Sequence, residues 1–199
     1  SAIENEGLIF VGPSASVIAA MGDKIQARNV MIAAGVPCIP GSPGALPLES
    51  SAVHDIARQL GYPVIVKAAG GGGGRGMRVV WDEAELDGAV ALTREEARSA
   101  FNNPELYMER FLKAPRHVEI QIMCDAYGNG VHLGSRDCSM QRRHQKVIEE
   151  APAPFIAPEM IEHVAKRSLA ACQDMGYCGV GTFEFLYEDG EFYFIEMNT

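Results

Sequence analysis

Five consecutive glycines, Gly70–Gly74, constrain the fold of this chain more than any other feature. They follow an apolar, β-rich stretch at 62–69 that contains Lys67, and Arg75 and a second apolar stretch at 77–81 come after them. Ordering so many glycines costs backbone entropy, and the expected benefit is a loop whose amides can close over a phosphate chain. No Gly-Lys-Ser/Thr ends the loop, so it is not a Walker A motif, and a strand rather than a helix is expected to follow, which excludes a dinucleotide fingerprint. The sequence indicates a phosphate-binding flap between two strands, with a flexible surface loop as the alternative.

Charge and composition restrict the possible partners. A net charge of -9 over 199 residues argues against a protein that coats nucleic acid, although one nucleotide needs only a local positive patch. The five cysteines are odd in number and form no Cys-x-x-Cys pair, which argues against a disulfide framework or a zinc site. Ser1–Gly7 carries two glutamates and no basic residue, so we expect that it is not a signal peptide, and no apolar run is long enough to span a bilayer. We expect a soluble protein of the cytoplasm, or of the mitochondrion in a eukaryote, without nucleic-acid or membrane partners.

Hydrophobic periodicity and turn residues predict an alternation of helices and strands, and hence an α/β (α+β) fold. Ser14 is a predicted N-cap, and Gly35 is a predicted helix end. The predicted helices are 15–21, 23–34, 51–60, 82–100 and 159–175. The predicted strands are 8–11, 62–69, 77–81, 106–111, 117–123, 130–136, 180–187 and 191–197.

An acidic hairpin is predicted at 180–197. Strand alternation places Phe183 and Phe185 on one face and Glu184 on the other. The same alternation puts Phe192, Phe194, Glu196 and Asn198 on a common face, so that two carboxylates and an amide oxygen can converge. Such hard oxygen ligands suit Mg²⁺. A solvated strand face with incidental acids is the alternative.

Cationic side chains are concentrated at 136–146, in a chain that is otherwise acidic. Most charge runs are solvated loops, and composition alone favours that interpretation. The functional alternative is a loop that neutralises an anionic substrate or developing phosphate charge. Two weaker signals are the strand end Glu109–Leu112, where backbone groups could hold a planar base, and His117, which could meet a ribose or phosphate.

Taken together, these segments resemble the ATP-grasp family, in its biotin carboxylase branch, and the resemblance covers essentially the whole chain. The segment most specific to biotin-dependent carboxylases is Arg136-Asp-Cys-Ser-Met-Gln-Arg-Arg-His-Gln-Lys146. The other segments that carry it, in the family's order, are Phe10-Val-Gly-Pro-Ser14, Met21-Gly-Asp-Lys24, Lys67 with Gly70–Gly76, Arg116-His-Val-Glu-Ile-Gln121, Gly181-Thr-Phe-Glu-Phe185 and Phe194-Ile-Glu-Met-Asn-Thr199.

The resemblance implies a role for individual residues. ATP phosphates would meet Lys24, Lys67 and the flap glycines Gly73 and Gly74, while Lys146 would contact bicarbonate or carboxyphosphate. The adenine would be held, largely through backbone groups, by Glu109, Arg110, Phe111 and Leu112. The nucleotide pocket would be lined by His117, Gln141 and His144. Mg²⁺ or Mn²⁺ would be coordinated by Glu184, Glu196 and Asn198, of which the two glutamates also count as nucleotide contacts.

The resemblance also implies a reaction, an ATP-dependent ligation. Bicarbonate attacks the γ-phosphate of ATP, and the resulting carboxyphosphate delivers CO₂ to biotin on a carrier protein, within an intact enzyme that is a homodimer and works with a carboxyltransferase, for example in fatty acid biosynthesis. We expect an ATP-grasp fold truncated at both ends, which lacks the catalytic arginine that follows Asn198-Thr199 in the family and cannot carboxylate biotin alone. The expected regions are a Rossmann-like remnant at 1–22, a helix and linker at 23–42, a small mobile lid at 43–112 and an incomplete C-terminal subdomain at 113–199.

Two other functions stay open at this point. The first is the nucleotide-binding part of another ATP-grasp ligase, which joins a carboxylate to an amine and shares the glycine loop and acidic hairpin. The second is a nucleotide-binding module without catalytic activity. A requirement for bicarbonate, with stimulation by biotin, distinguishes the carboxylase from both.

Overall fold

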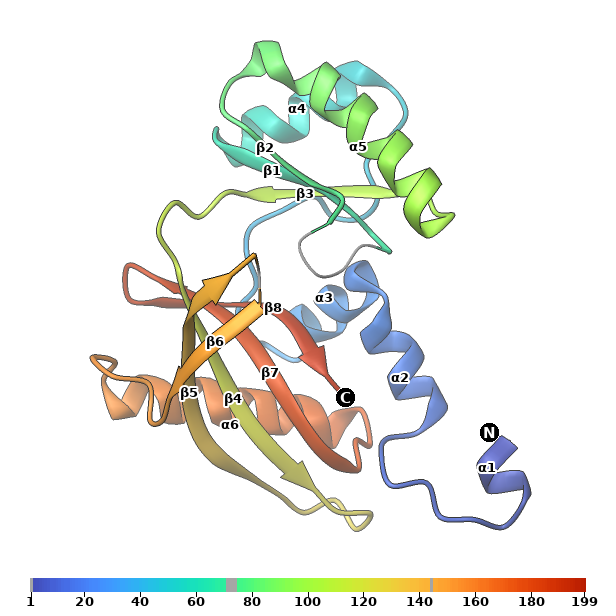
Figure 1. Cartoon of the computed structure of the whole chain (residues 1–199), viewed down its shortest axis with the longest axis vertical. Coiled ribbons are helices and arrows are strands. Elements are labelled where there is room, and N and C mark those ends of the chain that lie inside the picture. The colour runs from blue at the N-terminus through green and yellow to red at the C-terminus, as the bar shows by residue number, and fades with distance from the viewer. Residues whose placement is uncertain (1, 71–74, 144) are drawn as a thin grey trace. The chain divides into compact units, whose positions relative to one another are not determined.

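Two antiparallel sheets organise the chain in the computed structural model, which describes residues 2–70, 75–143 and 145–199 (Figure 1). They belong to two units, each with its own core. The five-stranded unit is formed by 2–38, 115–142 and 146–199, and the three-stranded unit by the described residues of 39–114 and 143–145. Within the described ranges, no helix has the length and apolar character needed to cross a membrane.

The three-stranded unit is a sheet in the order β2-β1-β3, with α4 and α5 packed on it (Figure 1). Its apolar side chains come from alternate strand positions and from one side of each helix; Val64, Val66 and Met108 are fully buried. Asp82 caps the turn that leads into α5 by accepting a hydrogen bond from the Ala84 N–H at 2.9 Å. The elements are α4 (Ser50–Leu60), β1 (Val64–Ala68), β2 (Met77–Val80), the 3₁₀ turn η1 (Glu83–Glu85), α5 (Leu86–Phe101) and β3 (Leu106–Arg110).

The five-stranded unit is a sheet in the order β6-β5-β4-β7-β8, with α6 across one face (Figure 1). Helices α2 and α3 contact β8, and Ser14 caps α2 as expected, accepting from the Val17 N–H at 3.4 Å. The helices are α1 (Ala2–Asn5), α2 (Ala15–Gly22), α3 (Lys24–Ala33) and α6 (Pro158–Asp174). The strands are β4 (Arg116–Cys124), β5 (Gly130–Arg142), β6 (Gln145–Glu150), β7 (Gly179–Glu188) and β8 (Glu191–Asn198).

The two faces of the central strands differ in chemistry because their sequences alternate. Val118, Ile120 and Ile122 on β4 and Phe183 and Phe185 on β7 are fully buried in the core that includes the inner side of α6. The residues between them point to the opposite face, because side chains alternate along a strand. The apolar face thus fixes where a row of polar side chains must lie.

Most predicted helices and strands are confirmed, but two expectations are wrong. Leu8–Val11 is not a strand: it pairs with no strand of the described chain, and Ile9 and Val11 are 90% and 94% exposed. The segment 136–146 is not a solvated loop. β5 continues to Arg142 and β6 begins at Gln145, so most of the cationic run is paired strand. The charges concealed this strand because they interrupt the apolar alternation by which strands are detected.

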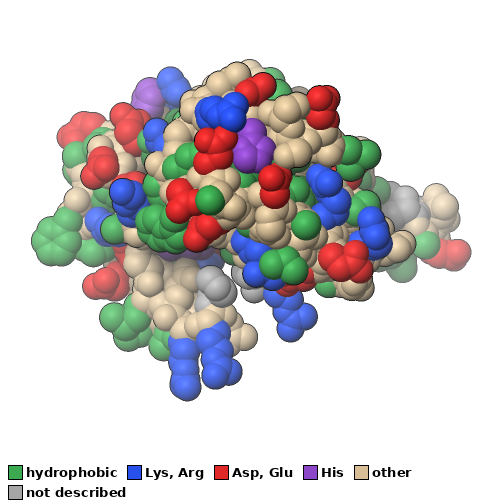
Figure 2. All heavy atoms as spheres, turned by 90° about the horizontal axis from the view of Figure 1, so that it is seen from above, with side chains coloured by type: hydrophobic (Ala, Val, Ile, Leu, Met, Phe, Trp, Pro, Cys, Tyr) green, Lys and Arg blue, Asp and Glu red, His purple; other side chains and the backbone are tan. Residues whose placement is uncertain are grey.

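On the face that Figure 2 presents, charge is mixed rather than concentrated by sign. Figure 2 shows acidic and basic side chains interspersed on the face it presents, with a histidine among them. In the three-stranded unit, the Arg58 guanidinium lies 2.6 Å from Glu83 Oε1, and the Arg78 guanidinium lies 3.4 Å from Glu96 Oε2. That face therefore carries no continuous positive field of the kind that attracts a nucleic-acid backbone.

Candidate functional site

A row of charged residues crosses the polar face of the five-stranded sheet. Arg136 on β5 lies opposite Glu119 on β4, Glu119 lies opposite Glu184 on β7, and Glu184 lies opposite Glu196 on β8. Glu119 and Glu184 are 3% and 5% exposed. Like charges directly opposite one another destabilise a sheet, so this row requires cations.

Lys146 on β6 supplies one of these cations. Its Nζ donates to Glu119 Oε2 at 2.5 Å and to Glu184 Oε1 at 2.7 Å. Asn198 Nδ2 also donates to Glu184 Oε1, at 2.6 Å. Lys146 and Asn198, both predicted as site residues, therefore each contact Glu184, a third predicted site residue.

The electrostatics follow from these contacts. Burial raises the pKa of Glu184, but the contacts with His117 and Lys146 outweigh it and lower the pKa to about 2. Burial lowers the pKa of Lys146, but the hydrogen bonds to Glu119 and Glu184 outweigh it and raise the pKa above its ordinary value. Glu184 and Lys146 are therefore both charged at neutral pH. Glu184 can bind a cation in place of Lys146, and Lys146 can bind an anion in place of Glu184.

His117 and Gln141 flank the row, as expected for a common pocket. His117 Nε2 approaches Glu184 Oε2 to 2.8 Å, without the alignment of a hydrogen bond. On its other side, His117 Nδ1 lies 3.0 Å from Gln141 Nε2, which also donates to the Cys138 carbonyl at 2.9 Å. The imidazole is held between a carboxylate and an amide and keeps one nitrogen directed at the site.

A β-bulge on β8 corrects the predicted faces of the acidic hairpin. Glu196 pairs with Glu184, but Phe194 pairs with Phe185, so Ile195 has no partner on β7. The extra residue reverses the alternation, and Phe194 turns into the core while Glu196 joins Glu184. The prediction that Phe194 and Glu196 share a face is wrong, whereas the convergence of the two carboxylates is confirmed.

The donor set fits a divalent cation. Glu184 and Glu196 offer hard oxygen ligands from adjacent strands, as Mg²⁺ or Mn²⁺ prefers. In the described chain, ligand atoms of His117, Glu119 and Glu184 also lie within 4.8 Å of one another. A second such group contains Cys138, whose pKa burial raises to about 12; its protonated thiol is a poor ligand.

The two lysines predicted to bind ATP phosphates, Lys24 and Lys67, are each held by a carboxylate. In the five-stranded unit, Lys24 Nζ lies 3.5 Å from Glu196 Oε2. In the three-stranded unit, Lys67 Nζ donates to the buried Glu109 Oε2 at 2.5 Å and lies 5.8 Å from the centre of the Tyr107 ring. Both ammonium groups thus rest on anions that a phosphate could replace.

The strand end predicted to hold adenine already uses two of its amides. The Arg110 N–H donates to the Pro40 carbonyl at 2.9 Å, and the Phe111 N–H to the Pro63 carbonyl at 3.0 Å. The Phe111 ring packs edge-on against Trp81, and Leu112 is buried. Neither of these two amides can bind a base while its present hydrogen bond persists. Gly73, Gly74 and His144 lie outside the described residues.

Sequence reasoning missed Glu119 and Arg136 as site residues. Arg136 Nε donates to Glu119 Oε1 at 2.6 Å, and Arg136 Nη2 donates to Gln121 Oε1 at 3.0 Å. The available signal was the alternation His117-Val-Glu-Ile-Gln121, in which every second residue is polar. That pattern places His117, Glu119 and Gln121 on one face once a strand is assumed.

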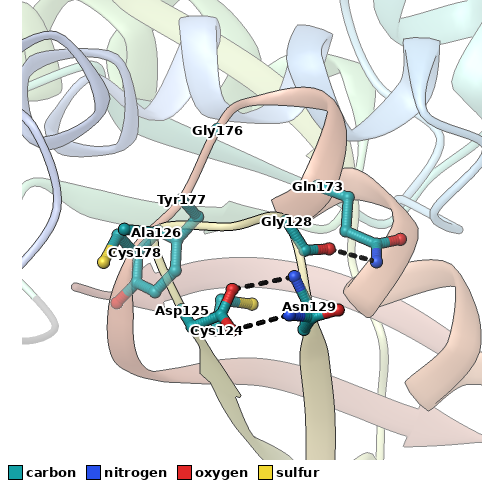
Figure 3. A pocket seen from close by; sticks show the side chains of 9 residues that line it. All are labelled: Cys124, Asp125, Ala126, Gly128, Asn129, Gln173, Gly176, Tyr177 and Cys178. Carbon is teal, nitrogen blue, oxygen red and sulfur yellow. Dashed lines mark hydrogen bonds between the residues drawn. The ribbon is translucent and has the colours of Figure 1, made fainter.

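A small cavity at the far end of the sheet does not belong to this site (Figure 3). Its volume is about 80 Å³, and its polar side chains serve the β4–β5 turn. Asp125 Oδ1 accepts from the Tyr127 and Asn129 N–H groups, and Gln173 Nε2 donates to the Gly128 carbonyl. A space for a few waters, with its polar groups already engaged, is no nucleotide site.

Comparison with known proteins agrees with this geometry. Residues 23–199 match the family model described as carbamoyl-phosphate synthase L chain, ATP binding domain. Biotin carboxylase of Pseudomonas aeruginosa is 61% identical over 197 residues, which are 99% of this chain and 44% of that protein. Biotin carboxylase 1 of Bacillus subtilis is 48% identical over 198 residues, which are 98% of this chain and 44% of that protein.

Solved structures match the whole chain. A biotin carboxylase complex with β,γ-ATP from Campylobacter jejuni has a TM-score of 0.94 at 48% identity and covers 100% of this chain, which spans 44% of that one. The biotin carboxylase domain of Hydrogenobacter thermophilus 2-oxoglutarate carboxylase, with MgADP and bicarbonate, has a TM-score of 0.93 at 44% identity, with the same coverage. The expected ATP-grasp architecture is confirmed, and the chain spans less than half the length of these relatives.

Proposed function

Because the chain belongs to the family described as carbamoyl-phosphate synthase L chain, ATP binding domain, we propose that it forms the ATP- and metal-binding core of a biotin carboxylase. The contact of Lys146 with both Glu119 and Glu184 is the observation that carries this proposal. It joins the motif most specific to biotin-dependent carboxylases to the acidic strands that would hold a metal. The similarity to biotin carboxylases over nearly the entire chain supports the same conclusion.

Charge neutralisation and positioning are the chemistry that these residues can supply, and phosphoryl transfer needs little else. Glu184, Glu196 and Asn198 would hold Mg²⁺ or Mn²⁺, which when bound neutralises phosphate charge. In the three-stranded unit, Lys67 and the segment 109–112 are the proposed contacts to phosphate and adenine. Lys24, His117 and Gln141 are the proposed nucleotide contacts of the other unit, together with the family positions Gly73, Gly74 and His144.

Lys146 is the proposed contact to bicarbonate. Its ammonium group lies on the polar face with a fixed charge, and it can orient an anion that attacks the γ-phosphate of ATP. ADP leaves, and the carboxyphosphate formed then breaks down to phosphate and CO₂, which takes the place of the proton on the ureido nitrogen of biotin. The partners in the whole protein are a biotin carrier and a carboxyltransferase. The names of two relatives, propionyl-CoA carboxylase alpha chain and pyruvate carboxylase, support a place for such chains in larger carboxylases.

Calorimetric titration with MgATP tests the proposed site. Binding should be saturable, and Lys67→Ala and Glu184→Gln should each weaken it by about 10- to 100-fold, because each removes a charge-assisted contact. Lys166→Ala and Glu162→Gln change an exposed pair on α6 and should leave the affinity unaltered. Absence of binding by a folded sample, or equal loss in the control variants, would contradict the proposal.

Turnover in the full-length protein distinguishes the carboxylase from another ATP-grasp ligase. Phosphate release should require bicarbonate and increase with free biotin. A requirement for an amino acid instead of bicarbonate would identify a carboxylate–amine ligase.

A further inference from the structure

Glu119 is a buried carboxylate that no predicted role includes. Its two oxygens bind different cations: Oε1 accepts from Arg136 Nε at 2.6 Å, and Oε2 accepts from Lys146 Nζ at 2.5 Å. A buried carboxylate is costly unless both oxygens are satisfied, and here both are. The geometry therefore makes Glu119 a bridge between a structural arginine on β5 and the lysine on β6.

Lys146 also contacts Glu184, and a metal ion bound to Glu184 would weaken that contact. Its Nζ lies 2.7 Å from Glu184 Oε1, and Glu184 is also a proposed ligand of the divalent cation. A dication on that carboxylate would repel the ammonium group over the same few ångströms. Glu119 is then the remaining anion in contact with Lys146 among the described side chains.

Arg136 holds the Glu119 carboxylate in the orientation in which it contacts Lys146. Both Nε and Nη2 of Arg136 lie within 2.6 Å of Glu119 Oε1, and Nη2 also donates to Gln121 Oε1 at 3.0 Å. Gln121 is fastened in turn, because its Oε1 accepts from Thr182 Oγ1 at 3.1 Å and its Nε2 donates to the Gly181 carbonyl at 2.8 Å. The fork of the guanidinium fixes the Glu119 carboxylate and leaves Oε2 directed at Lys146.

We propose that Glu119 is a positioning residue that holds the Lys146 ammonium in place for bicarbonate while a metal ion occupies Glu184, and that Arg136 reserves Glu119 for this task. The inference rests on the proposed function, in which Lys146 contacts bicarbonate. In this role Glu119 acts through Lys146 rather than by direct contact with bicarbonate or nucleotide. Its loss should therefore affect the binding of one substrate and not of the other.

Steady-state kinetics of the full-length protein test this inference. Glu119→Gln keeps the shape of the side chain but removes the anion, and the KM for bicarbonate should rise about tenfold or more, as when a supporting residue is lost from a site. The KM for MgATP should stay within about twofold, because the proposed role of Glu119 concerns bicarbonate alone. Damage to the whole fold would instead change both constants. Glu119→Asp keeps the charge on a shorter stem and should give an intermediate KM for bicarbonate.

Glu149→Gln is the matched control. Glu149 Oε2 lies 3.5 Å from Arg136 Nε at the exposed edge, so the same substitution alters the same arginine without touching Lys146. It should leave both KM values unchanged. Where Glu119→Gln does not fold, as judged by thermal melting, the Glu119→Asp variant decides.

The outcomes separate the two proposals. Wild-type protein whose ATP turnover ignores bicarbonate would refute the proposed function. Bicarbonate-dependent turnover in which the Glu119 variants keep the wild-type KM for bicarbonate, or raise the KM for MgATP equally, would overturn the positioning role.

Discussion

Glu184 and Glu196 lie directly opposite each other on β7 and β8, immediately beside the position where Ile195 has no partner. The bulge reconciles an aromatic core with an acidic site on a single short strand. Phe194, on the core side of the bulge, is 3% exposed and contacts the rings of Phe183 and Phe185. The strand changes face between Phe194 and Glu196 because of one inserted residue.

Deletions in β8 test this account. Removing Ile195 should leave Phe194 opposite Phe185 and Glu196 opposite Glu184, because the remaining residues then alternate regularly. Removing Tyr193 should turn one of the flanking phenylalanines out of the core, with a loss of about 3–5 kcal/mol in the free energy of unfolding. Urea denaturation of both variants gives the comparison, and a larger loss on removal of Ile195 would show that the bulge itself is essential.

The lowered pKa of Glu184 predicts acid sensitivity. A carboxylate whose folded-state pKa is about 2, against an ordinary value of 4.5, contributes stability that is present above pH 4.5 and is lost as the pH falls toward 2. The contribution is about 3 kcal/mol at most, because lowering a pKa by one pH unit corresponds to about 1.36 kcal/mol. Unfolding free energies of wild type and Glu184→Gln should therefore differ less at pH 2 than at pH 6.

The control for this pH series is Glu159→Gln, which changes an exposed carboxylate in the first turn of α6. Its stability should follow the wild-type curve. Curves for Glu184→Gln and wild type that stay parallel from pH 6 to pH 2 would show that Glu184 does not titrate as described.

His54 in the three-stranded unit should titrate above its ordinary pKa of 6.5. The hydrogen bond to Glu83 raises the pKa most, partial burial opposes it, and Asp87 adds to the increase. A raised pKa means that the contribution of His54 to stability is present below pH 6.5 and is lost as the pH rises through the folded-state pKa. Nuclear magnetic resonance of the imidazole should give a value above 6.5.

The variant Glu83→Gln should lower the pKa of His54, because it removes the largest favourable contact, at 2.9 Å from Nδ1. Glu95→Gln changes an exposed carboxylate that pairs with Arg98 and should leave the titration of His54 unaltered. Equal shifts in both variants would attribute the effect to general surface charge.

Two glycine substitutions should change stability in opposite directions. A methyl group on Gly181 would lie 2.6 Å from Tyr177 Oη and 2.8 Å from Met197 Cε, so Gly181→Ala should cost about 1–3 kcal/mol by overpacking. Gly88 lies within α5 with nothing near its missing side chain, so Gly88→Ala should stabilise the chain by about 0.5–1 kcal/mol. Thermal melting measures both, and a stable Gly181→Ala protein would contradict the tight packing around Tyr177.

Local patterns predicted most of the helices and strands and the acidic residues of the hairpin, and the family resemblance added Lys24, Gln141 and Lys146, but neither predicted which distant strands pair with each other. The alternation around Glu184 and the glycine run near Lys67 are visible within a few residues of sequence. The contact of Glu119 with Glu184 joins positions on β4 and β7 that are far apart in the chain, and no short pattern encodes that register. The bulge at Ile195 could not be predicted for the same reason, since it is defined only by how β8 pairs with β7.

The five-stranded unit is made of separate stretches of the chain, and this determines the order in which the two units can fold during synthesis. Helix α3 packs against β8, and Phe194 on β8 donates its N–H to the Pro37 carbonyl, so α3 is made long before the strand that it packs against. All the strands of the three-stranded unit have been synthesised once Arg110 has left the ribosome. On a nascent chain, Lys67 should therefore pair with Glu109 well before Lys24 can pair with Glu196. In the interval, α2 and α3 are the segments that need protection from aggregation.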